Sequence, residues 1–370
     1  VVCFVLMSKF KTTDCSRTHQ HTKYYGSLLG SSDDLQTSAS SCSLSDCSLP
    51  KSVREALGQV HPEVTKKFFG CGLPFPAKLE GCRVLDLGSG SGRDSFAYSK
   101  LVGASGHVMG IDMTEELVNA SRQYVEYHQK KFGYKEPNVS FVQGYMEKLS
   151  EAGIQTDSID VVSNCVICLC PDKRAVLQQA YNALKEGGEL YFSDMYASKV
   201  IPDHMKQDPV LWGEGMGGSL FWEDLISLAH SVGFSTPYLV TASRIVVYNK
   251  ELIEKAGGIS YASCTYRLFK LPKRPFMSEA TVSYKGTLAD FPGQLDFDSS
   301  HSFKKDVALK VSGEMAAILQ SSRLCQDFEI QISDNTTSDL TEFLPQLCRL
   351  NPFLLADKQG SSVAHCSKTS

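Results

Sequence analysis

The chain has 370 residues, of which 42% are hydrophobic and 21% are charged, a balance typical of an ordinary folded protein with two or three domains. Its formal net charge of −4 provides no basic field for nucleic acid, and no apolar run approaches the roughly 20 residues of a membrane-spanning helix. We therefore expect neither a nucleic-acid partner nor a membrane partner.

Thirteen cysteines are scattered along the chain, without the close regular spacing of a disulfide-rich secreted domain. This scatter favours thiols with redox or metal-binding roles, although any single cysteine more often serves as a small buried hydrophobic residue. The apolar start Val1–Met7 is too short for the core of a signal peptide. Together these features predict a cytoplasmic protein.

The first 50 residues are rich in Ser, Thr and Asp and show little periodicity, which predicts a flexible N-terminal arm. Tyr25 belongs to an aromatic pair in this polar setting, and it either caps a ligand or pins the arm to the domain. Cys42 and Cys47 lie among serines, with no local geometry that would fix them.

A helix is predicted over Lys51–Phe69, with an interruption at Pro62. Cys71 follows, flanked by Gly70 and Gly72, just before the first core strand. A thiol on such a flexible turn is better suited to reaction than to packing.

The most informative stretch joins an apolar strand, Arg83–Leu87, to a helix over Arg93–Leu101. The turn between them contains Gly88, Gly90 and Gly92. Glycine permits tight angles and close approach there, and the start of the helix offers unpaired N–H donors to a ligand. A dinucleotide fingerprint would have its third glycine where Arg93 stands, which disfavours NAD or NADPH.

A second strand over His107–Ile111 ends in Asp112, at the spacing of an acid that accepts hydrogen bonds from ribose hydroxyls. A nucleoside cofactor without a pyrophosphate fits both features. The competing interpretation is a tight turn that binds nothing.

Two further strands, Val139–Gln143 and Ser158–Asn164, place their carboxyl ends at the same edge of the predicted sheet. Met146 and Glu147 follow the first, where an adenine would lie on apolar side chains with its amino group near a carboxylate. Cys165 follows the second, at the edge where open parallel sheets bind ligands. A redox pair of Cys165 with Cys168 is disfavoured because no helix begins there to stabilise a thiolate.

A helix over Lys173–Leu184 and a fifth strand over Glu189–Phe192 complete the alternation of strand and helix. The pattern predicts an α/β fold with a doubly wound, mostly parallel, Rossmann-like sheet and a small C-terminal α+β appendage. The expected domains are a flexible arm at 1–50, a cofactor-binding domain at 51–271, an α+β domain at 272–335 and a disordered tail at 336–370. A Gly-rich stretch at 211–218 is expected to cover the strand ends.

Several of these segments resemble known motifs. Val84–Asp94, Gly110–Thr114, Ser163–Cys165 and Gly187–Asp194 resemble the motifs of class I S-adenosylmethionine-dependent methyltransferases. The contexts of Tyr25, Cys71 and the Leu211–Gly218 stretch resemble the animal arsenite methyltransferases specifically. The resemblance implies S-adenosylmethionine as the methyl donor, with the following binding residues: Tyr25, Asp86, Gly88, Gly90, Gly92, Asp112, Met113, Met146, Glu147 and Asn164.

What the family resemblance further implies is methylation of trivalent arsenic, from arsenite to methylarsenite and then to dimethylarsenite. Arsenic(III) is soft, so the thiolates of Cys42, Cys71 and Cys165 would hold it and leave its lone pair to attack the sulfonium methyl. A thiol reductant such as thioredoxin or glutathione would then return arsenic to the trivalent state. The alternatives are a methyltransferase for another small acceptor and a thiol-based metalloid-binding protein without catalysis.

One family cysteine is missing, because the residue after Trp212-Gly213-Glu214 is Gly215. Two outcomes are open. Either Cys42, Cys71 and Cys165 still provide three ligands, with Cys47 as a less favoured substitute in the arm, or a neighbour such as Cys168 or Cys170 replaces the missing thiol. We expect S-adenosylmethionine binding to be retained and arsenite methylation to be impaired.

Overall fold

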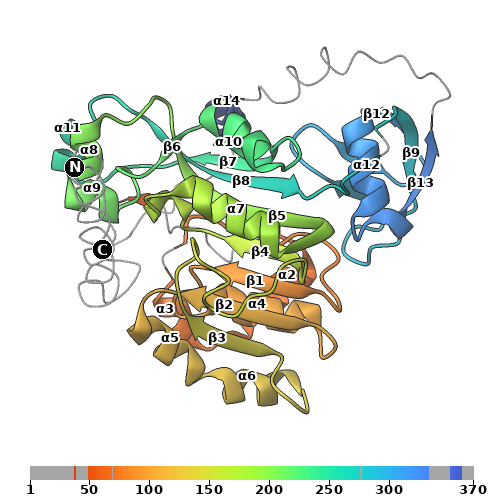
Figure 1. Cartoon of the computed structure of the whole chain (residues 1–370), viewed down its shortest axis with the longest axis horizontal. Helices are drawn as coiled ribbons and strands as arrows, with labels where there is room; N and C mark the ends of the chain where they lie inside the picture. Colours follow the sequence, from red (N-terminus) through yellow and green to blue (C-terminus); the bar gives the residue numbers. More distant parts are fainter. Residues whose placement is uncertain (1–36, 39–48, 69, 276, 333–350, 361–370) are drawn as a thin grey trace, which may run out of the picture.

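The computed structural model describes residues 37–38, 49–68, 70–275, 277–332 and 351–360 (Figure 1). Within these ranges no helix has both the length and the apolar character needed to span a membrane. The centre is an eight-stranded sheet in the order β3-β2-β1-β4-β5-β8-β7, with β6 paired to β5. Its strands are β1 (Arg83–Leu87), β2 (His107–Asp112), β3 (Val139–Gln143), β4 (Ile159–Asn164), β5 (Leu184–Ala197), β6 (Leu220–Phe221), β7 (Tyr238–Arg244) and β8 (Tyr261–Phe269).

The first five strands are parallel, and β8 runs antiparallel to both β5 and β7. Parallel neighbours need long crossover connections, which the helices between the strands supply. The expected mostly parallel, Rossmann-like sheet is therefore confirmed. Its helices are α2 (Lys51–Gly58), α3 (Pro62–Lys66), α4 (Arg93–Val102), α5 (Glu115–Arg122), α6 (Val125–Phe132), α7 (Lys173–Ala183), α8 (Asp203–Gln207), α9 (Pro209–Gly213), α10 (Asp224–Val232) and α11 (Lys250–Lys255).

Two apolar clusters cover the two faces of this sheet. One packs α7 and α10 against it, and the other packs α2 and α4. Strand β1 lies between them, which explains its nearly continuous apolar sequence: Val84, Leu85 and Leu87 are each at most 1% exposed.

The C-terminal part forms smaller sheets of its own, at the right-hand end of the molecule in Figure 1. It packs against β7 and β8 through an apolar cluster that includes Tyr238 and Phe269. Its elements are β9 (Ala280–Tyr284), β10 (Gln294–Asp296), β11 (Ser302–Lys304), β12 (Ala308–Val311), α12 (Gly313–Ser321), the 3-10 helix η5 (Cys325–Asp327) and β13 (Phe328–Ile332).

One expectation about the C-terminal tail is wrong. Pro352–Gly360, inside the segment expected to be disordered, forms the helix α14. Phe353 and Ala356 are buried in the core beside β7, and Arg244 of β7 pairs with Asp357 at 2.8 Å. A tail helix this short is ordered by its packing on the sheet, since isolated helices of this length are marginal.

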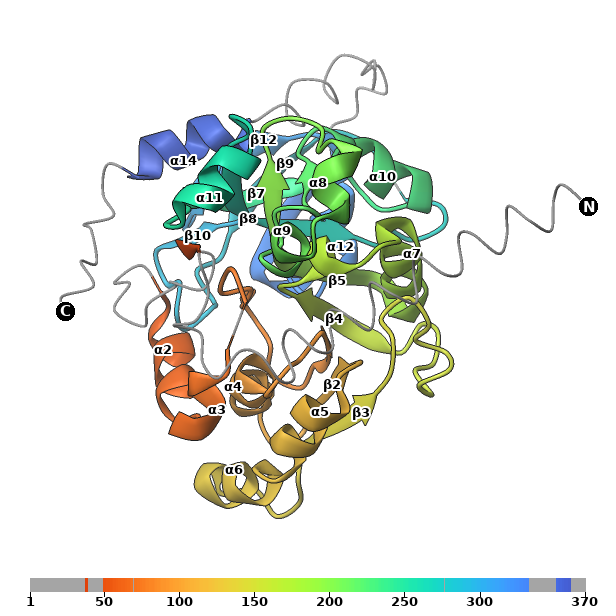
Figure 2. The same ribbon diagram turned by 90° about the vertical axis from the view of Figure 1, so that its left-hand side faces the viewer.

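The Gly-rich stretch 211–218 is closely packed rather than open. It contains the C-terminal half of α9, and Leu211, Trp212 and Met216 are all buried. In Figure 2 the helices α8 and α9 lie in the foreground, and their side chains Met205 and Leu211 share an apolar cluster with Met195 of β5. This segment therefore covers one end of the sheet.

Candidate functional site

The turn between β1 and α4 lets a ligand approach the backbone closely. Gly88, Gly90 and Gly92 have positive φ angles of 69°, 53° and 92°, which residues with a side chain rarely adopt. At Gly88 space is limiting as well, because a Cβ there would lie 2.3 Å from Cγ2 of Val166. Any larger residue at this position would intrude into the cavity next to the turn.

Asp112 is fixed beside this turn, at the end of β2. The Gly90 N–H donates to its Oδ2 at 2.9 Å, and the Thr114 N–H donates to its Oδ1 at 2.8 Å. Burial raises the pKa of this carboxyl against the effect of both hydrogen bonds. Each oxygen keeps a lone pair, so the carboxylate can accept from two further hydroxyl groups.

Two adjoining cavities lie beyond the carboxyl ends of β1 to β4, with volumes of about 60 and 50 Å³. Their shared wall includes Gly88, Asp112, Val166 and Leu169. Strand β1 stands between β2 and β4, so the cavities open where the strand order reverses, which is where open α/β sheets bind ligands. The predicted residues Asp86 and Gly90 line the first cavity, and Met113, Met146 and Glu147 line the second.

The first cavity has an acidic wall. Asp86, Asp94 and Asp112 line it together with one basic residue, Lys67. Asp94 pairs with Arg93 at 2.6 Å, and Asp86 accepts a hydrogen bond from Ser95 Oγ, also at 2.6 Å. Burial, and then the charge of Asp94, raise the pKa of Asp86 to about 8. Carboxylates favour a cationic ligand and repel a pyrophosphate, which agrees with the exclusion of a dinucleotide.

Two of the predicted cysteines are in contact beside this cavity, and one of them lines it. Cys165 follows β4 and lines the first cavity, while Cys71 lies on the turn before β1 and is buried. The Cys71 thiol donates to the backbone carbonyl of Cys165 at 3.7 Å, and the Cys165 thiol lies 4.0 Å from the carbonyl of Gly72. Segments far apart in sequence thus bring Cys71, which lines neither cavity, next to the loop that carries Cys165.

Asn164, expected to bind the cofactor, lies beneath the site instead. Its side chain is fully buried, its Nδ2 donates to the Leu87 carbonyl at 2.6 Å, and its Oδ1 accepts from the backbone N–H groups of Val166 and Ile167. The amide connects β1 to the loop after β4, and its Nδ2 also lies 4.0 Å from Sδ of Met146 in the wall of the second cavity. Its role here is to hold the Cys165 loop in place.

The remaining predicted residues divide into two groups. Gly92 is the N-cap of α4, and its N–H donates to the Ser89 carbonyl at 2.9 Å rather than facing either cavity. Tyr25, Cys42 and Cys47 lie outside the described residues.

Several wall residues were not predicted from the sequence. Phe68 lies under the guanidinium of Arg93, which stands 3.1 Å from the ring centroid. Leu117 of α5, and Val166 and Leu169 after β4, complete the apolar part of the wall. Each of these residues lies within a few positions of Cys71, Asp112 or Cys165 in the sequence. That closeness to predicted site residues is the signal by which they could have been found.

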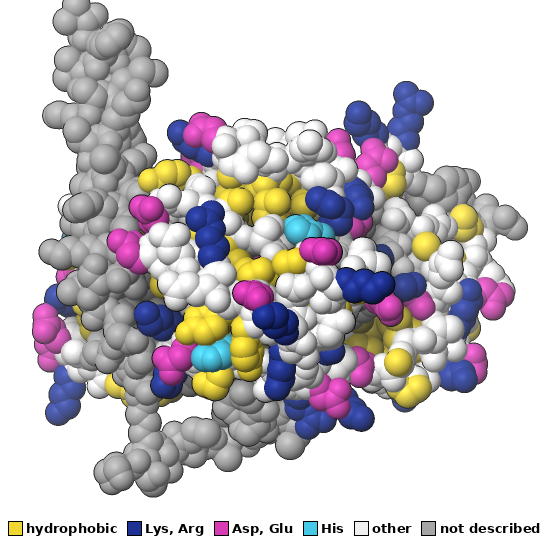
Figure 3. Space-filling view, turned by 90° about the horizontal axis from the view of Figure 1, so that it is seen from below, with side chains coloured by type: hydrophobic (Ala, Val, Ile, Leu, Met, Phe, Trp, Pro, Cys, Tyr) yellow, Lys and Arg dark blue, Asp and Glu magenta, His cyan; other side chains and the backbone are white. Residues whose placement is uncertain are grey.

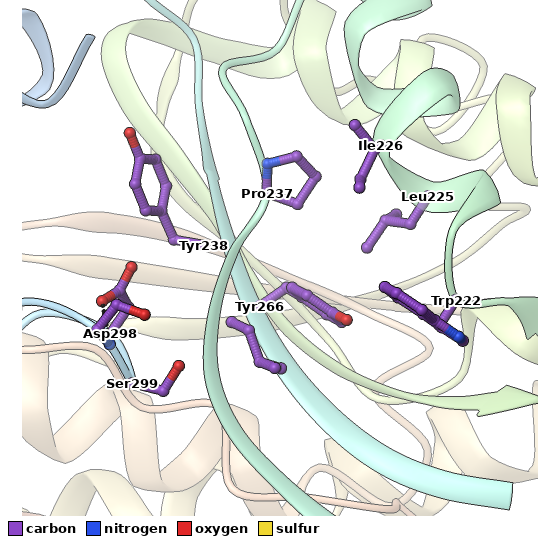
Figure 4. A pocket seen from close by; sticks show the side chains of 10 residues that line it. Trp222, Leu225, Ile226, Pro237, Tyr238, Tyr266, Asp298 and Ser299 are labelled. Atoms are coloured by element: carbon purple, nitrogen blue, oxygen red, sulfur yellow. Dashed lines mark hydrogen bonds between the residues drawn. The ribbon is translucent and has the colours of Figure 1, made fainter. Parts of the chain in front are cut away.

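A third cavity, shown in Figure 4, lies away from this cleft. Trp222, Leu225 and Pro237 line one side, and Asp298 and Ser299 of the C-terminal part line the other. Its volume of about 20 Å³ holds roughly one water molecule. It is too small for a cofactor.

The molecular surface in Figure 3 mixes charges of both signs. On this face Lys and Arg side chains are interspersed with Asp and Glu, and neither kind forms a continuous field. This face therefore lacks the basic stripe that would track a phosphate backbone.

Comparison with known sequences covers most of the chain. A methyltransferase domain model matches residues 78–238, and an arsenite methyltransferase C-terminal domain model matches residues 277–370. The arsenite methyltransferase of Mus musculus is 46% identical over 349 residues, which cover 93% of this chain and 92% of the relative. That of Homo sapiens is 46% identical over 347 residues, with the same coverage of both chains.

Comparison with solved structures leads to the same group. The crystal structure of an arsenic(III) S-adenosylmethionine methyltransferase from Chlamydomonas reinhardtii matches with a TM-score of 0.73 and 40% identity, over 77% of this chain and 97% of that one. The bacterial arsenite methyltransferase of Aquipseudomonas alcaligenes is 44% identical over 311 residues, covering 83% of this chain and 88% of the relative. The chain therefore belongs to the arsenite methyltransferase family, within the S-adenosylmethionine-dependent methyltransferases.

Proposed function

We propose that this chain transfers methyl groups from S-adenosylmethionine to trivalent arsenic, giving methylarsenite and then dimethylarsenite. The observation that carries the proposal is the contact between Cys71 and Cys165, the second of which lines a cavity that the glycine turn and Asp112 also line. A thiophilic substrate and a nucleoside cofactor would thus be bound side by side. The names of the relatives support the choice of arsenic.

The cleft has groups that would suit each part of S-adenosylmethionine. Asp112 has lone pairs for two ribose hydroxyls, and Met113 and Met146 provide apolar surfaces for an adenine, with Glu147 near its amino group. When ionised, the carboxyl of Asp86 would suit the positive charges of the methionine moiety. When bound, the cofactor supplies an electrophilic methyl carbon on its sulfonium sulfur.

Soft thiolates are the natural ligands of arsenic(III), and three of them leave its lone pair exposed. We assign two of the three to Cys71 and Cys165, and the sequence offers Cys42 or a neighbour of Cys165 as the third. The lone pair forms the As–C bond while the S–C bond of the sulfonium breaks. Arsenic loses no proton in this step, so the protein's contribution is orientation rather than general base catalysis.

Each methyl transfer oxidises arsenic(III) to arsenic(V), and a further round requires its reduction. Two thiols supply the two electrons and become one disulfide, which thioredoxin or glutathione would reduce in turn. Both reductants are abundant in the cytoplasm, where we place the protein.

We also propose functional units at 51–271 and 272–335, because the second has sheets of its own.

The direct test is a methyl-transfer assay with purified protein, labelled S-adenosylmethionine, arsenite and a dithiol reductant, with the products separated by chromatography. Mono- and dimethylated arsenic are expected. Cofactor binding without any methylated arsenic would contradict the proposal and point to another small acceptor. Arsenite binding that is indifferent to S-adenosylmethionine, again without product, would favour a metalloid-binding protein.

Replacing Asp112 by alanine is expected to weaken S-adenosylmethionine binding at least roughly tenfold, because charge-assisted hydrogen bonds to the ribose are lost. Titration calorimetry of the purified chain measures the change. The matched control is Glu136→Ala, which removes an exposed carboxylate in a loop. Unchanged affinity in Asp112→Ala, with the fold verified by circular dichroism, would refute the ribose assignment.

Cofactor affinity is expected to rise with pH. The pKa of Asp86 is about 8 without ligand, so this carboxyl is mostly neutral at pH 6 and about half ionised at pH 8. A cationic ligand prefers the ionised form, so binding should tighten by roughly tenfold between these pH values and release a proton. Calorimetry in buffers of different ionisation enthalpy counts that proton. Asp86→Asn should make the cofactor affinity nearly independent of pH. An equally steep rise of affinity with pH in this variant would exclude Asp86 as its source.

A further inference from the structure

Gly215 and Cys168 face each other across the segment that follows α9. Gly215 has a φ of 81°, and a Cβ built on it would lie 3.3 Å from Cys168 Sγ and 3.6 Å from Met195 Sδ. The sulfur of Cys168 therefore borders the space that a side chain at position 215 would enter. A thiol is present there, but it comes from the 3-10 helix η4 (Ile167–Leu169).

Cys168 shares its surroundings with Cys71. Both belong to a buried sulfur-rich cluster, which we define as Cys71, Cys168, Met195, Met205 and Met216. Each of these residues is at most 5% exposed. Cys165 borders the cluster, since its carbonyl accepts the Cys71 thiol. Polarisable side chains from η4, β5, α8 and the turn before β1 thus pack in one cluster, which suits a soft ligand.

We propose that Cys168 is the third thiolate that binds arsenic, together with Cys71 and Cys165, so that it takes over the position left without a thiol at Gly215. This inference rests on the proposed function and makes it more specific. Cys170 is the weaker candidate because its side chain lines the second cavity, on the Met146 side, and packs in a different cluster.

Binding requires one local rearrangement. Among the described residues, no three His, Cys, Asp or Glu side chains are already arranged to hold a metal ion. The Cys168 thiol contacts the Asp194 carboxylate, so it must turn from Asp194 toward Cys71. The backbone of Cys168 can stay in place while its side chain turns, because Asp194 Oδ1 accepts hydrogen bonds from the N–H groups of Cys168 at 3.1 Å and Met195 at 2.9 Å.

The ligand exchange balances without an external base or oxidant. Arsenite reaches the site as neutral As(OH)₃. Each As–S bond that forms replaces one As–O bond, and the hydroxyl leaves as water with the proton of the thiol. Arsenic remains trivalent, so the three thiols bind the substrate and prepare it for methyl transfer without any redox change.

The test counts the sulfur atoms bound to arsenic by X-ray absorption spectroscopy of the full chain loaded with arsenite. Three arsenic-bound sulfur atoms are expected in the unsubstituted chain and two in Cys168→Ser. The substitution should also weaken arsenite affinity by at least roughly tenfold and leave S-adenosylmethionine affinity unchanged. Three are also expected in Cys42→Ser. The matched control is Cys82→Ser, which alters another buried thiol that donates to a backbone carbonyl at 3.7 Å.

Three sulfurs in Cys168→Ser, or two in Cys42→Ser, would overturn this inference and leave the proposed function standing. Absence of arsenic-bound sulfur in the unsubstituted chain would overturn both. A second measurement avoids substitution altogether: arsenite should slow alkylation of Cys168 in mild denaturant, but not that of Cys82. Equal alkylation of Cys168 with and without arsenite would also contradict the inference.

Discussion

Replacing Cys165 by serine should lower the rate of arsenic methylation by at least about a hundredfold, while S-adenosylmethionine still binds. In the proposed function Cys165 would lie at the border between the two reactants, because it lines the cavity beside the glycine turn and its carbonyl accepts the Cys71 thiol. A serine oxygen is a poor ligand for a soft centre, and even small misplacement of two reactants can cost about 10²-fold. The readout is methylated arsenic from labelled cofactor.

The control for this experiment is Cys325→Ser, since Cys325 is exposed and lies in the C-terminal part of the chain. Its methylation rate should equal that of the unsubstituted chain. A serine at position 165 keeps nearly the same volume, so an intact fold and an unchanged cofactor affinity are expected. Full methylation by Cys165→Ser would remove this thiol from the mechanism.

The parts of the site that could be predicted from sequence are those in which the signal is local. Gly88 and Gly90 are recognisable because a tight turn between an apolar strand and a helix needs glycine, and Asp112 because it ends the next strand. Cys165 follows from the rule that ligands bind beyond the carboxyl ends of parallel strands. In each case a few neighbouring residues carry the information.

The parts that could not be predicted depend on contacts between distant segments. The sequence offered Cys168 and Cys170 as substitutes for the thiol missing at Gly215, but only the fold shows that the Cys168 sulfur stands beside Gly215. Asn164 sits next to Cys165 in a motif, yet its amide bonds to the Leu87 carbonyl, to its own loop and to Met146 Sδ, and it lines neither cavity. The helix α14 follows from its packing on β7, because its sequence is too short to be helical alone.

A buried ion triad between the two parts of the chain is a further long-range feature. Glu189 of β5 is fully buried, and its Oε2 accepts from Arg267 Nη2 at 2.7 Å and Nε at 3.0 Å. Arg323, which follows α12, pairs with its other oxygen and also donates to the carbonyls of Ala77 and Lys78. The triad therefore joins the C-terminal part to the large sheet and to the segment before β1.

Replacing Glu189 by alanine should lower the free energy of unfolding by about 3–5 kcal/mol, because two buried guanidinium groups would lose their carboxylate and keep only backbone carbonyls as partners. Urea denaturation of both proteins at pH 7 measures the loss. The control, Glu126→Gln, breaks an exposed pair with Lys130 and should leave the unfolding midpoint almost unchanged. A Glu189→Ala variant as stable as the control would mean that water enters and solvates the arginines.

The same triad makes the free energy of unfolding depend on pH. Burial opposes the ionised form of Glu189, but the two arginines outweigh it and hold its pKa below the ordinary value of 4.5. A carboxyl with a lowered pKa in the folded state adds stability above its unfolded pKa and loses it as the pH falls further. The difference between the unsubstituted chain and Glu189→Ala should therefore be complete at neutral pH and shrink below about pH 4.5. A constant difference through that range would assign the loss to the cavity left by the side chain rather than to its charge.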